Sequence, residues 1–368
     1  MKIVILRPNT GDFGKIGTYN VQEVGMANAL IKMGHKVDVL FFHRDTSRII
    51  KDETYDFVYY LPHKTFLMHG IFDTNLLEEF SPDRVIMMSD NQLWAKNVIL
   101  WCKKKSIPCV HYFGNVLSDN PNWKNQFYTK LILRRNLKSY DYSINVAKTD
   151  AVKVEMLKHN IPFSRVIHVG LDREMLSTKL NRDLDTRREL NIANDEIAML
   201  FVGRLVNYKK PILACKILQE LLKRGIRSKL YIIGKGTLEN QLKDYIDDNN
   251  LRERVVYLKC VPYEDMYKYM ISCDVYINLS PKEIFGMTVL EALYYGLPVV
   301  ANHAPGPDVI IENGVSGYLC DYGDDPIRWA DQIVSAIDNR TALSKNGHKR
   351  VEEHFMWDSL VGEFLKDK

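Results

Sequence analysis

The sequence predicts an α/β protein with two doubly wound parallel-sheet domains that face each other across a cleft. Three observations support this fold class. Short apolar runs alternate with helical patterns along the chain, which is typical of a parallel sheet covered on both faces. The alternation stops in a polar stretch at about residues 166–187 and then starts again. The length of 368 residues exceeds one typical domain and fits two.

The first domain is predicted at residues 1–170. A glycine-rich loop containing Gly14, Gly17 and Thr18 follows its first strand, at the edge where open α/β sheets bind ligands. The spacing does not match the G-x-G-x-x-G fingerprint of dinucleotide sites, so NAD is disfavoured, and a plain tight turn is the alternative. Strands are expected at residues 2–6, 37–42, 57–60, 84–88, 108–112 and 143–146, and a helix at about 150–160.

Two further features of the first domain are candidates for the cleft. The polar cluster Ser89, Asp90 and Asn91 ends the strand at 84–88, and we expect it to line the cleft. A simple helix cap at Asp90 is the alternative. His111 lies on the strand at 108–112, where it is either a site residue or a residue of the core.

The second domain is predicted at residues 171–352. After its fourth strand comes the stretch PKEIFGMTVLEALYYGLP at residues 281–298, which predicts a loop, a helix and a stop. Gly296 and Pro298 close the helix in the usual order of a terminal glycine and a following proline, and Phe285, Gly286, Met287 and Thr288 open it. Strands are expected at residues 198–202, 229–233, 255–258, 275–279 and 298–301.

Glu283 and Glu291 lie eight residues apart around the start of this helix. A helix N-terminus has unpaired N–H groups and a positive dipole end, so it suits phosphate. An ionised carboxylate only accepts hydrogen bonds, so it suits sugar hydroxyls. The combination predicts a sugar-nucleotide site, whereas an ordinary helix with two surface glutamates is the alternative.

Two cations follow the first strand of the second domain, Arg204 beside Gly203 and then Lys209. Arginine presents a planar fork to phosphate oxygens, and lysine presents a point charge. Cleavage of a sugar–nucleotide bond leaves a diphosphate with growing negative charge, which preorganised cations stabilise. The alternative is two solvated basic residues after a strand.

The pattern P-x-E-x-F-G-x-x-x-L-E-A-x-x-x-G-x-P-V-V-A, which begins at Pro281, resembles the donor-site motif of family 4 retaining glycosyltransferases (glycosyltransferase group 1). The resemblance implies that Glu283 binds the donor sugar, Glu291 the nucleotide ribose, and Arg204 and Lys209 the diphosphate. It further implies donor contacts at Gly203, Gly234, Gly236, Val261, Gly14, Gly17 and residues 285–288, an acceptor side at Thr18 and Ser89–Asn91, and His111 near the reacting carbon.

The resemblance also implies the GT-B fold, with two Rossmann-like domains and a C-terminal helix at about 353–368 that crosses back to the first domain. Phe355 and Trp357 match the family's Phe-x-Trp there, and Val169–Asp172 is similar to its passage between domains. Two loops depart from the pattern. Lys259 stands where the family has a glycine near the base, so base contacts do not carry over. Residues Ala304–Asp308 stand where the family has Gly-Gly and then an acid, so donor-sugar preference does not carry over.

The implied reaction is a metal-independent, retaining transfer of a hexosyl group from a nucleotide sugar to a glycan or lipid-linked acceptor in bacterial surface-polysaccharide biosynthesis. A UDP-sugar is the favoured donor, and a GDP-sugar is the alternative. No cofactor is implied. The rivals are an enzyme that hydrolyses or epimerises the sugar nucleotide, and a non-catalytic GT-B subunit that binds glycan or stabilises a partner enzyme. The D-x-D at residues 183–185 lies in the polar stretch between the domains, so we expect a surface feature and no metal.

Composition indicates a cytoplasmic protein. The net charge of +4 is mild, and no nucleic-acid partner is expected. The six cysteines form no C-x-x-C pair, so reduced thiols are expected. No stretch approaches the roughly 20 apolar residues of a membrane span. Residues 122–140 hold five cations and no acid among aromatic and apolar residues, which predicts docking on an anionic membrane at its inner face. The alternative is an ordinary helix whose apolar residues at 127, 128, 131 and 132 face the sheet.

Overall fold

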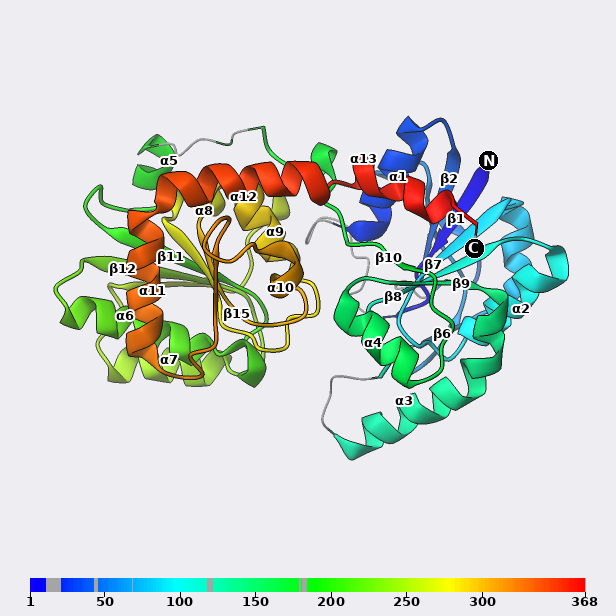
Figure 1. Ribbon diagram of the computed structural model, residues 1–368, viewed down its shortest axis with the longest axis horizontal. Coiled ribbons are helices and arrows are strands. Elements are labelled where there is room, and N and C mark those ends of the chain that lie inside the picture. Colours follow the sequence, from blue (N-terminus) through cyan, green and yellow to red (C-terminus); the bar gives the residue numbers. More distant parts are fainter. Residues whose placement is uncertain are drawn as a thin grey trace. The chain divides into compact units, whose positions relative to one another are not determined.

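The computed structural model describes residues 1–10, 21–42, 46–67, 69–117, 122–178, 180 and 184–367. The chain forms two compact units, the first from Met1–Arg173 with Met356–Lys368 and the second from Glu174–Phe355. The divisions therefore fall at 173/174 and 355/356, three residues beyond the boundaries expected at 170/171 and 352/353. Figure 1 shows a central sheet with helices around it in each unit.

Unit 1 has an eight-stranded sheet in the order β10-β9-β8-β7-β1-β2-β4-β3. All neighbours pair in parallel except β3 and β4. Its strands are β1 (Lys2–Leu6), β2 (Lys36–Phe41), β3 (Ile50–Lys51), β4 (Val58–Tyr60), β7 (Arg84–Met88), β8 (Cys109–Phe113), β9 (Ile144–Ala147) and β10 (Arg165–Val166), with a separate hairpin of β5 (Lys64–Phe66) and β6 (His69–Ile71).

The helices of unit 1 cover this sheet and shield its apolar strands from water. Residues of β1, β7 and β8 are buried along their whole length, apart from a half-buried Lys2, as expected of central parallel strands. The helical segments are α1 (Gln22–Lys32), η1 (Thr74–Phe80), α2 (Ala95–Lys105), α3 (Trp123–Asn136), η2 (Leu137–Tyr142), α4 (Asp150–Lys158), η3 (Arg173–Met175, at the boundary), α13 (Trp357–Leu360) and η5 (Val361–Leu365).

Unit 2 has a six-stranded, wholly parallel sheet in the order β13-β12-β11-β14-β15-β16. Its strands are β11 (Ile197–Val202), β12 (Ser228–Ile233), β13 (Val255–Leu258), β14 (Val275–Asn278), β15 (Val299–Asn302) and β16 (Tyr318–Cys320). Its helical segments are α5 (Leu184–Glu189), η4 (Asn207–Lys209), α6 (Pro211–Lys223), α7 (Glu239–Asp248), α8 (Tyr263–Ser272), α9 (Met287–Tyr294), α10 (Pro307–Ile310), α11 (Pro326–Asp338) and α12 (Arg340–His354).

The strands predicted from apolar runs are confirmed to within one or two residues at each end, and so is the helix at about 150–160. Local signals explain some helix bounds. The Thr149 side chain accepts from the N–H of Val152 at 3.3 Å and begins α4. Gly296, with φ at +68°, follows the end of α9, as the predicted stop requires. The hairpin β5–β6 was not predicted, because its six residues are too few and too mixed to show a period.

The returning C-terminal segment packs beside the segment that leaves unit 1. The N–H of Trp357 donates to the carbonyl of Leu171 at 3.1 Å. A Cβ on Gly170 would lie 2.6 Å from the Trp357 nitrogen, so only glycine fits there. Asp172 accepts from Asn28 of α1 at 2.8 Å. The predicted return to the first domain is therefore confirmed, with α13 and η5 packed on α1 rather than one continuous helix.

Candidate functional site

The site of unit 2 begins where its strand order changes direction. Strands β12 and β13 extend from one side of β11, and β14 to β16 from the other. In doubly wound sheets a ligand binds at the carboxyl ends of the strands beside this switch point. Arg204 follows β11 and Glu283 follows β14, so the fold brings the two predicted segments to the same edge of one sheet.

Lys209 and Glu283 are in direct contact at this edge. The Lys209 ammonium forms an ion pair with Oε2 of Glu283, and Asn278 Nδ2 donates to the same carboxylate oxygen at 3.3 Å. Both charged side chains are 17% exposed, so a small ligand reaches them from solvent. The pair therefore connects the loop after β11, which holds the predicted cations, to the loop after β14, which holds Glu283.

The start of α9 lies directly after Glu283. Gly286 has φ at +96°, a left-handed conformation that glycine adopts without the steric cost of a side chain, and it turns the chain into Met287 and Thr288, the first helical residues. The first N–H groups of a helix have no partner within it. Those of Met287 and Thr288 are therefore available to phosphate oxygens at the positive end of the helix dipole, whereas the N–H of Val289 donates to the Gly286 carbonyl at 2.9 Å.

The loop after β15 packs tightly against this turn. The N–H of Gly306 donates to the Glu283 carbonyl at 2.9 Å, and a Cβ on Gly306 would lie 1.9 Å from the Phe285 carbonyl oxygen. Phe285 itself is buried, with its ring 6.4 Å from that of Phe355. The loop that departs from the family pattern thus fixes the backbone at Glu283.

Arg204 extends from the same edge and is exposed. Its guanidinium donates to the Tyr208 hydroxyl and lies 5.8 Å from the centre of the Tyr208 ring, as does the Lys209 nitrogen. Tyr208 is therefore a common neighbour of the two cations. Lys210 is directed elsewhere, because its ammonium pairs with Asp324 at 2.8 Å.

The glycines at 203, 234 and 236 hold the loops after β11 and β12 together. A Cβ on Gly234 would lie 1.9 Å from the Gly203 carbonyl oxygen, and one on Gly236 would lie 2.3 Å from that of Leu205. The N–H of Leu205 donates to the Lys235 carbonyl at 3.0 Å. These approaches fix the backbone on either side of Arg204.

Glu291 lies inside α9 and is only 6% exposed. Its carboxylate accepts from the Tyr263 hydroxyl at 3.0 Å. Burial raises the pKa of the Glu291 carboxyl to about 7, and the hydrogen bond from Tyr263 acts in the opposite direction. Tyr263 begins α8 two residues after Val261, so it links the loop that holds Val261 to Glu291.

Sequence reasoning missed Tyr208, Asn278 and Tyr263. Tyr208 lies four residues after Arg204 on the same loop, and Asn278 is the last residue of its strand, so position alone would have marked both. No signal in the sequence marks Tyr263, because its contact with Glu291 depends on how α8 and α9 approach each other.

His111 is completely buried in unit 1. Its Nε2 lies 3.0 Å from Oγ of Ser89 and 3.2 Å from the Ser89 carbonyl, and its ring lies 3.9 Å from that of Phe113. Burial lowers the pKa of the imidazole to about 3, so it stays neutral. This placement favours the core alternative for His111 over a catalytic role.

The polar cluster after β7 is occupied by contacts within unit 1. Asn91 accepts from the Tyr140 hydroxyl at 3.0 Å and donates to the Thr129 carbonyl at 3.0 Å. Asp90 does not cap a helix; it accepts from the N–H groups of Gly114 and Asn115 at 3.1 and 2.8 Å. These contacts favour a structural role for Ser89 and Asn91. Gly14, Gly17 and Thr18 lie outside the described residues.

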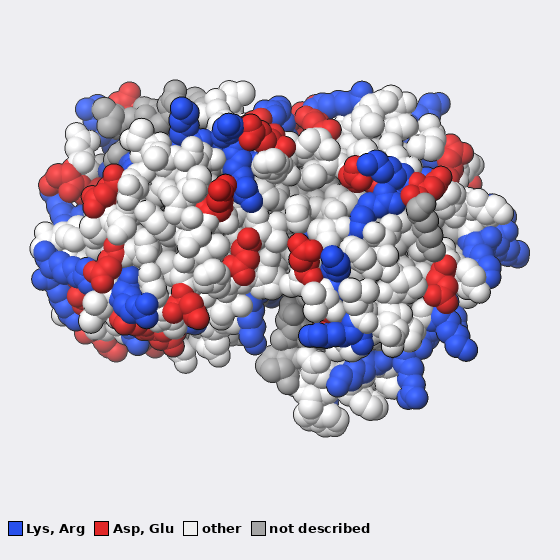
Figure 2. All heavy atoms as spheres, in the orientation of Figure 1, with Lys and Arg blue, Asp and Glu red and all other residues white. Residues whose placement is uncertain are grey.

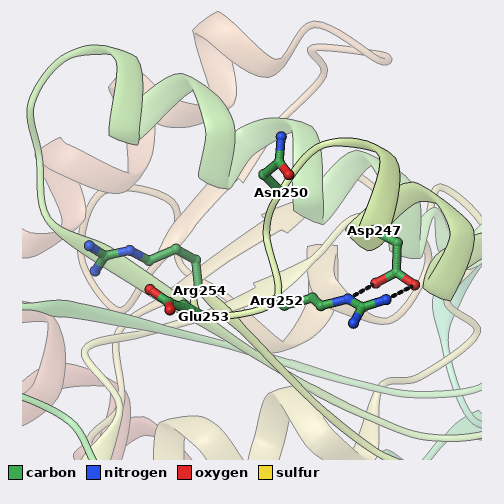
Figure 3. Close-up of a pocket in the computed structure, with 5 residues that line it drawn as sticks. All are labelled: Asp247, Asn250, Arg252, Glu253 and Arg254. Carbon is green, nitrogen blue, oxygen red and sulfur yellow. Dashed lines mark hydrogen bonds and ion pairs between the residues drawn. The ribbon is translucent and has the colours of Figure 1, made fainter.

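A shallow groove at the opposite end of the unit 2 sheet carries no part of this site. Figure 3 shows Arg252 paired with Asp247 in it, 2.5 and 2.7 Å apart. The lining residues, Asp247, Asn250, Arg252, Glu253 and Arg254, precede β13, whereas ligands of such sheets bind where strands end.

Among the described residues, no three His, Cys, Asp or Glu side chains are placed to hold a metal ion. Of the predicted D-x-D, Asp183 lies outside the described residues, and Asp185 is an exposed residue of α5 that pairs with Arg188 at 3.1 Å. No helix in the described part of the chain could span a lipid bilayer.

Known proteins resemble this chain in sequence and in structure. Residues 183–350 match the family "Glycosyl transferases group 1". An uncharacterised glycosyltransferase of Methanocaldococcus jannaschii is 26% identical over 370 residues, which cover 95% of this chain and 93% of that protein. The D-inositol 3-phosphate glycosyltransferase of Corynebacterium diphtheriae is 30% identical over 201 residues, and the match spans about half of its length, 47%.

The solved structure of HepE from Anabaena in complex with UDP-glucose superposes with a TM-score of 0.72 at 18% identity, over 99% of each chain. The fold is therefore GT-B, as the sequence predicted. The similarity to glycosyltransferase group 1 proteins therefore lies in residues 183–350, most of unit 2, and the fold is shared over the whole chain.

Proposed function

We propose that the protein is a retaining glycosyltransferase that moves a sugar from a nucleotide-sugar donor to a glycan or lipid-linked acceptor in bacterial polysaccharide biosynthesis. One observation carries this proposal: the Lys209–Glu283 pair lies at the start of α9 and at the switch point of the unit 2 sheet. A cation, a sugar-binding carboxylate and free helix N–H groups thus meet where such sheets bind ligands.

Each part of the nucleotide-sugar donor has a protein partner in this arrangement. Arg204 and Lys209 hold the diphosphate together with the N–H groups at Met287 and Thr288. Glu283 accepts from hydroxyls of the transferred sugar, and Glu291 accepts from the ribose. Gly203, Gly234, Gly236 and Val261 let the backbone approach the nucleotide.

In the proposed step the bond between the anomeric carbon and the β-phosphate oxygen breaks. The nucleoside diphosphate leaves with the electron pair, and Arg204 and Lys209 stabilise its growing charge. The acceptor hydroxyl attacks from the face that the diphosphate leaves, and its proton passes to the departing phosphate oxygen. The anomeric configuration is therefore retained without a covalent intermediate and without a metal.

The donor is a UDP-sugar in this proposal, and a GDP-sugar is the alternative. Support comes from HepE, whose structure contains UDP-glucose. The reaction is placed in the cytoplasm, where nucleotide sugars are the available donors. The rival function is a non-catalytic subunit of the same fold, which the presence of Arg204, Lys209, Glu283 and Glu291 disfavours.

Incubation with UDP-, GDP- and ADP-sugars tests the proposal by thermal shift, followed by NMR of the product formed with a glycan acceptor. We expect stabilisation by one class of sugar nucleotide, and a product with the donor's anomeric configuration that also forms in chelator. Stabilisation without any transfer supports the non-catalytic subunit. An inverted product, or activity that only magnesium restores, contradicts the proposed mechanism.

A further inference from the structure

Helix α3 presents an unusual outer face to solvent. Four large apolar side chains on it are exposed, Trp123 by 70%, Phe127 by 55%, and Tyr128 and Leu131 by 45% each. Trp123, Phe127 and Leu131 recur every four residues, and Tyr128 lies three residues before Leu131, a spacing that keeps all four on one side of a helix. A surface of this kind marks an interaction site.

The opposite face of α3 packs against the rest of unit 1. Ile132, Leu133 and Asn136 are buried, and Asn136 donates to the Gln92 carbonyl at 2.7 Å. Of the four apolar residues that the alternative to docking placed against the sheet, at 127, 128, 131 and 132, only Ile132 is buried. The alternative therefore fails for the other three, and packing within unit 1 does not explain why they are apolar.

The cations of α3 divide into two groups. Arg135 is structural, because it donates to Asn97 of α2 at 2.7 Å and to the Leu93 carbonyl. Lys124, Lys130 and Arg134 are exposed on the same outer side as the apolar residues. Residues 122–140 contain no acid, and Figure 2 shows blue and white side chains without red ones along the lower edge where α3 lies.

We propose that the outer face of α3 docks on an anionic lipid bilayer. Aromatic and aliphatic side chains enter the boundary between headgroups and acyl chains, while cations on the same helix pair with anionic headgroups. The absence of acids from residues 122–140 makes the face complementary to a negative surface. The docking does not depend on the reaction proposed above; only its purpose, the approach to a lipid-linked acceptor, rests on that function.

Co-sedimentation of the full chain with vesicles tests the docking. We expect binding to phosphatidylcholine vesicles that contain phosphatidylglycerol, little binding to phosphatidylcholine alone, and loss at high salt. The triple variant Lys124→Glu, Lys130→Glu, Arg134→Glu should lower the partition coefficient on the order of 100-fold, because each cation near the surface contributes about fivefold. Arg135 is left in place because it holds α3 on α2.

A matched variant separates docking by α3 from general charge attraction. Lys158, Lys216 and Lys345 are exposed lysines on other helices, and changing them to Glu makes the same change in net charge. This control should bind vesicles like the unchanged protein. Equal loss in both variants, or equal recovery of the unchanged protein in the supernatant with either vesicle at low salt, overturns the proposal.

Trp123 reports whether α3 itself meets the lipid. Trp101, Trp329 and Trp357 are buried, and the fifth tryptophan, Trp94, is half-buried and donates to the Phe72 carbonyl at 2.8 Å. Trp123, which is 70% exposed, should therefore give most of the blue shift of emission and of the quenching by brominated lipid. Trp123→Phe should keep binding and lose most of this signal. Unchanged emission from vesicle-bound protein excludes α3 as the docking face. Calorimetry with UDP on every variant shows whether unit 2 is intact, so loss of docking and failure of the donor site are measured separately.

Discussion

Lys209 and Glu283, which are 74 residues apart in the chain, form an ion pair at the carboxyl edge of the unit 2 sheet. In the proposed donor complex these side chains have different partners, the diphosphate and the sugar. In the structure they neutralise each other, so neither partly buried charge is left alone. Donor binding then exchanges one set of charged contacts for another rather than dehydrating two isolated charges.

The first prediction concerns the cations beside the diphosphate. Arg204→Ala and Lys209→Ala should each weaken UDP binding by about 1.5–3 kcal/mol, the range for hydrogen bonds to charged groups. Calorimetry measures the change. Lys210→Ala is the matched control, because this neighbouring lysine pairs with Asp324, and its UDP affinity should stay unchanged. Equal losses in all three variants would show that general charge, not a built site, attracts the nucleotide.

The second prediction separates the two glutamates. Glu291→Ala should lose UDP affinity, because the ribose is part of the nucleotide. Glu283→Ala should keep most of that affinity and lose turnover, since its partner is the transferred sugar. UDP calorimetry and sugar-transfer rates on both variants decide between these roles. The reverse pattern would mean that the roles are exchanged.

The third prediction is a pH dependence of nucleotide binding. The pKa of the Glu291 carboxyl is raised to about 7 by burial, and only the ionised form accepts from both ribose hydroxyls. At pH 6 about one-tenth of the carboxyl is ionised and at pH 8 about nine-tenths, so UDP affinity should be about tenfold lower at pH 6. Calorimetry at both pH values is compared with Glu291→Gln, in which only the titration of UDP itself remains. Parallel pH profiles would contradict the assignment.

The same titration should appear in stability, with the opposite sense. The folded pKa lies above the ordinary 4.5, so the folded state binds more protons than the unfolded state between these values. Stability should therefore fall as pH rises from about 4.5 to 7, by up to about 3 kcal/mol relative to Glu291→Gln, and then level off. Denaturation of both proteins across this range provides the check.

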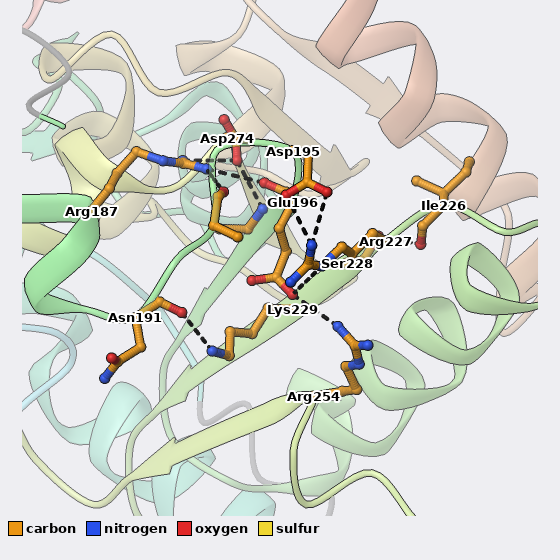
Figure 4. A network of polar contacts seen from close by, with 12 residues as sticks. Arg187, Asn191, Asp195, Glu196, Ile226, Arg227, Ser228, Lys229, Arg254 and Asp274 are labelled. Atoms are coloured by element: carbon orange, nitrogen blue, oxygen red, sulfur yellow. Dashed lines mark hydrogen bonds and ion pairs between the residues drawn. The ribbon is translucent and has the colours of Figure 1, made fainter.

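The fourth prediction concerns the polar network at the amino ends of the unit 2 strands. Figure 4 shows Arg187 directed at Asp274; the pair is 3.0 Å apart, and Arg187 is completely buried. Asp274 also pairs with Arg340, and Arg187 donates to the carbonyls of Ala193 and Glu196 at 3.1 Å each. Arg187→Ala should lower the free energy of unfolding by about 3–5 kcal/mol, because the buried Asp274 carboxylate would lose one of its compensating cations.

A matched control for this network is the exposed pair of Arg252 and Asp247 in Figure 3. Arg252→Ala should leave the denaturation midpoint unchanged, since exposed pairs contribute little. Comparable destabilisation in both variants would mean that burial does not decide the contribution of these ion pairs. UDP affinity of folded Arg187→Ala should match the unchanged protein, because the network lies at the other end of the sheet from the donor site.

The sequence by itself determined the fold class and the strands. Apolar runs of four to six residues bounded by polar loops are a local property, so the strands at 84–88 and 255–258 were placed correctly. Chain signals at Gly286 and Gly296 likewise predicted where α9 begins and ends, because backbone conformation depends mainly on neighbouring residues.

Only the tertiary structure decided which side chains meet and which remain exposed. The contact of Tyr263 with Glu291, and the burial of His111 beneath the ring of Phe113, join residues from different elements that no sequence period connects. The same holds for α3, where the apolar pattern fits a buried stripe or an outward face equally well. Ile132 and Leu133 pack against the rest of unit 1, and Phe127 and Leu131 are left in solvent, because a helix buries only the side that its neighbours cover.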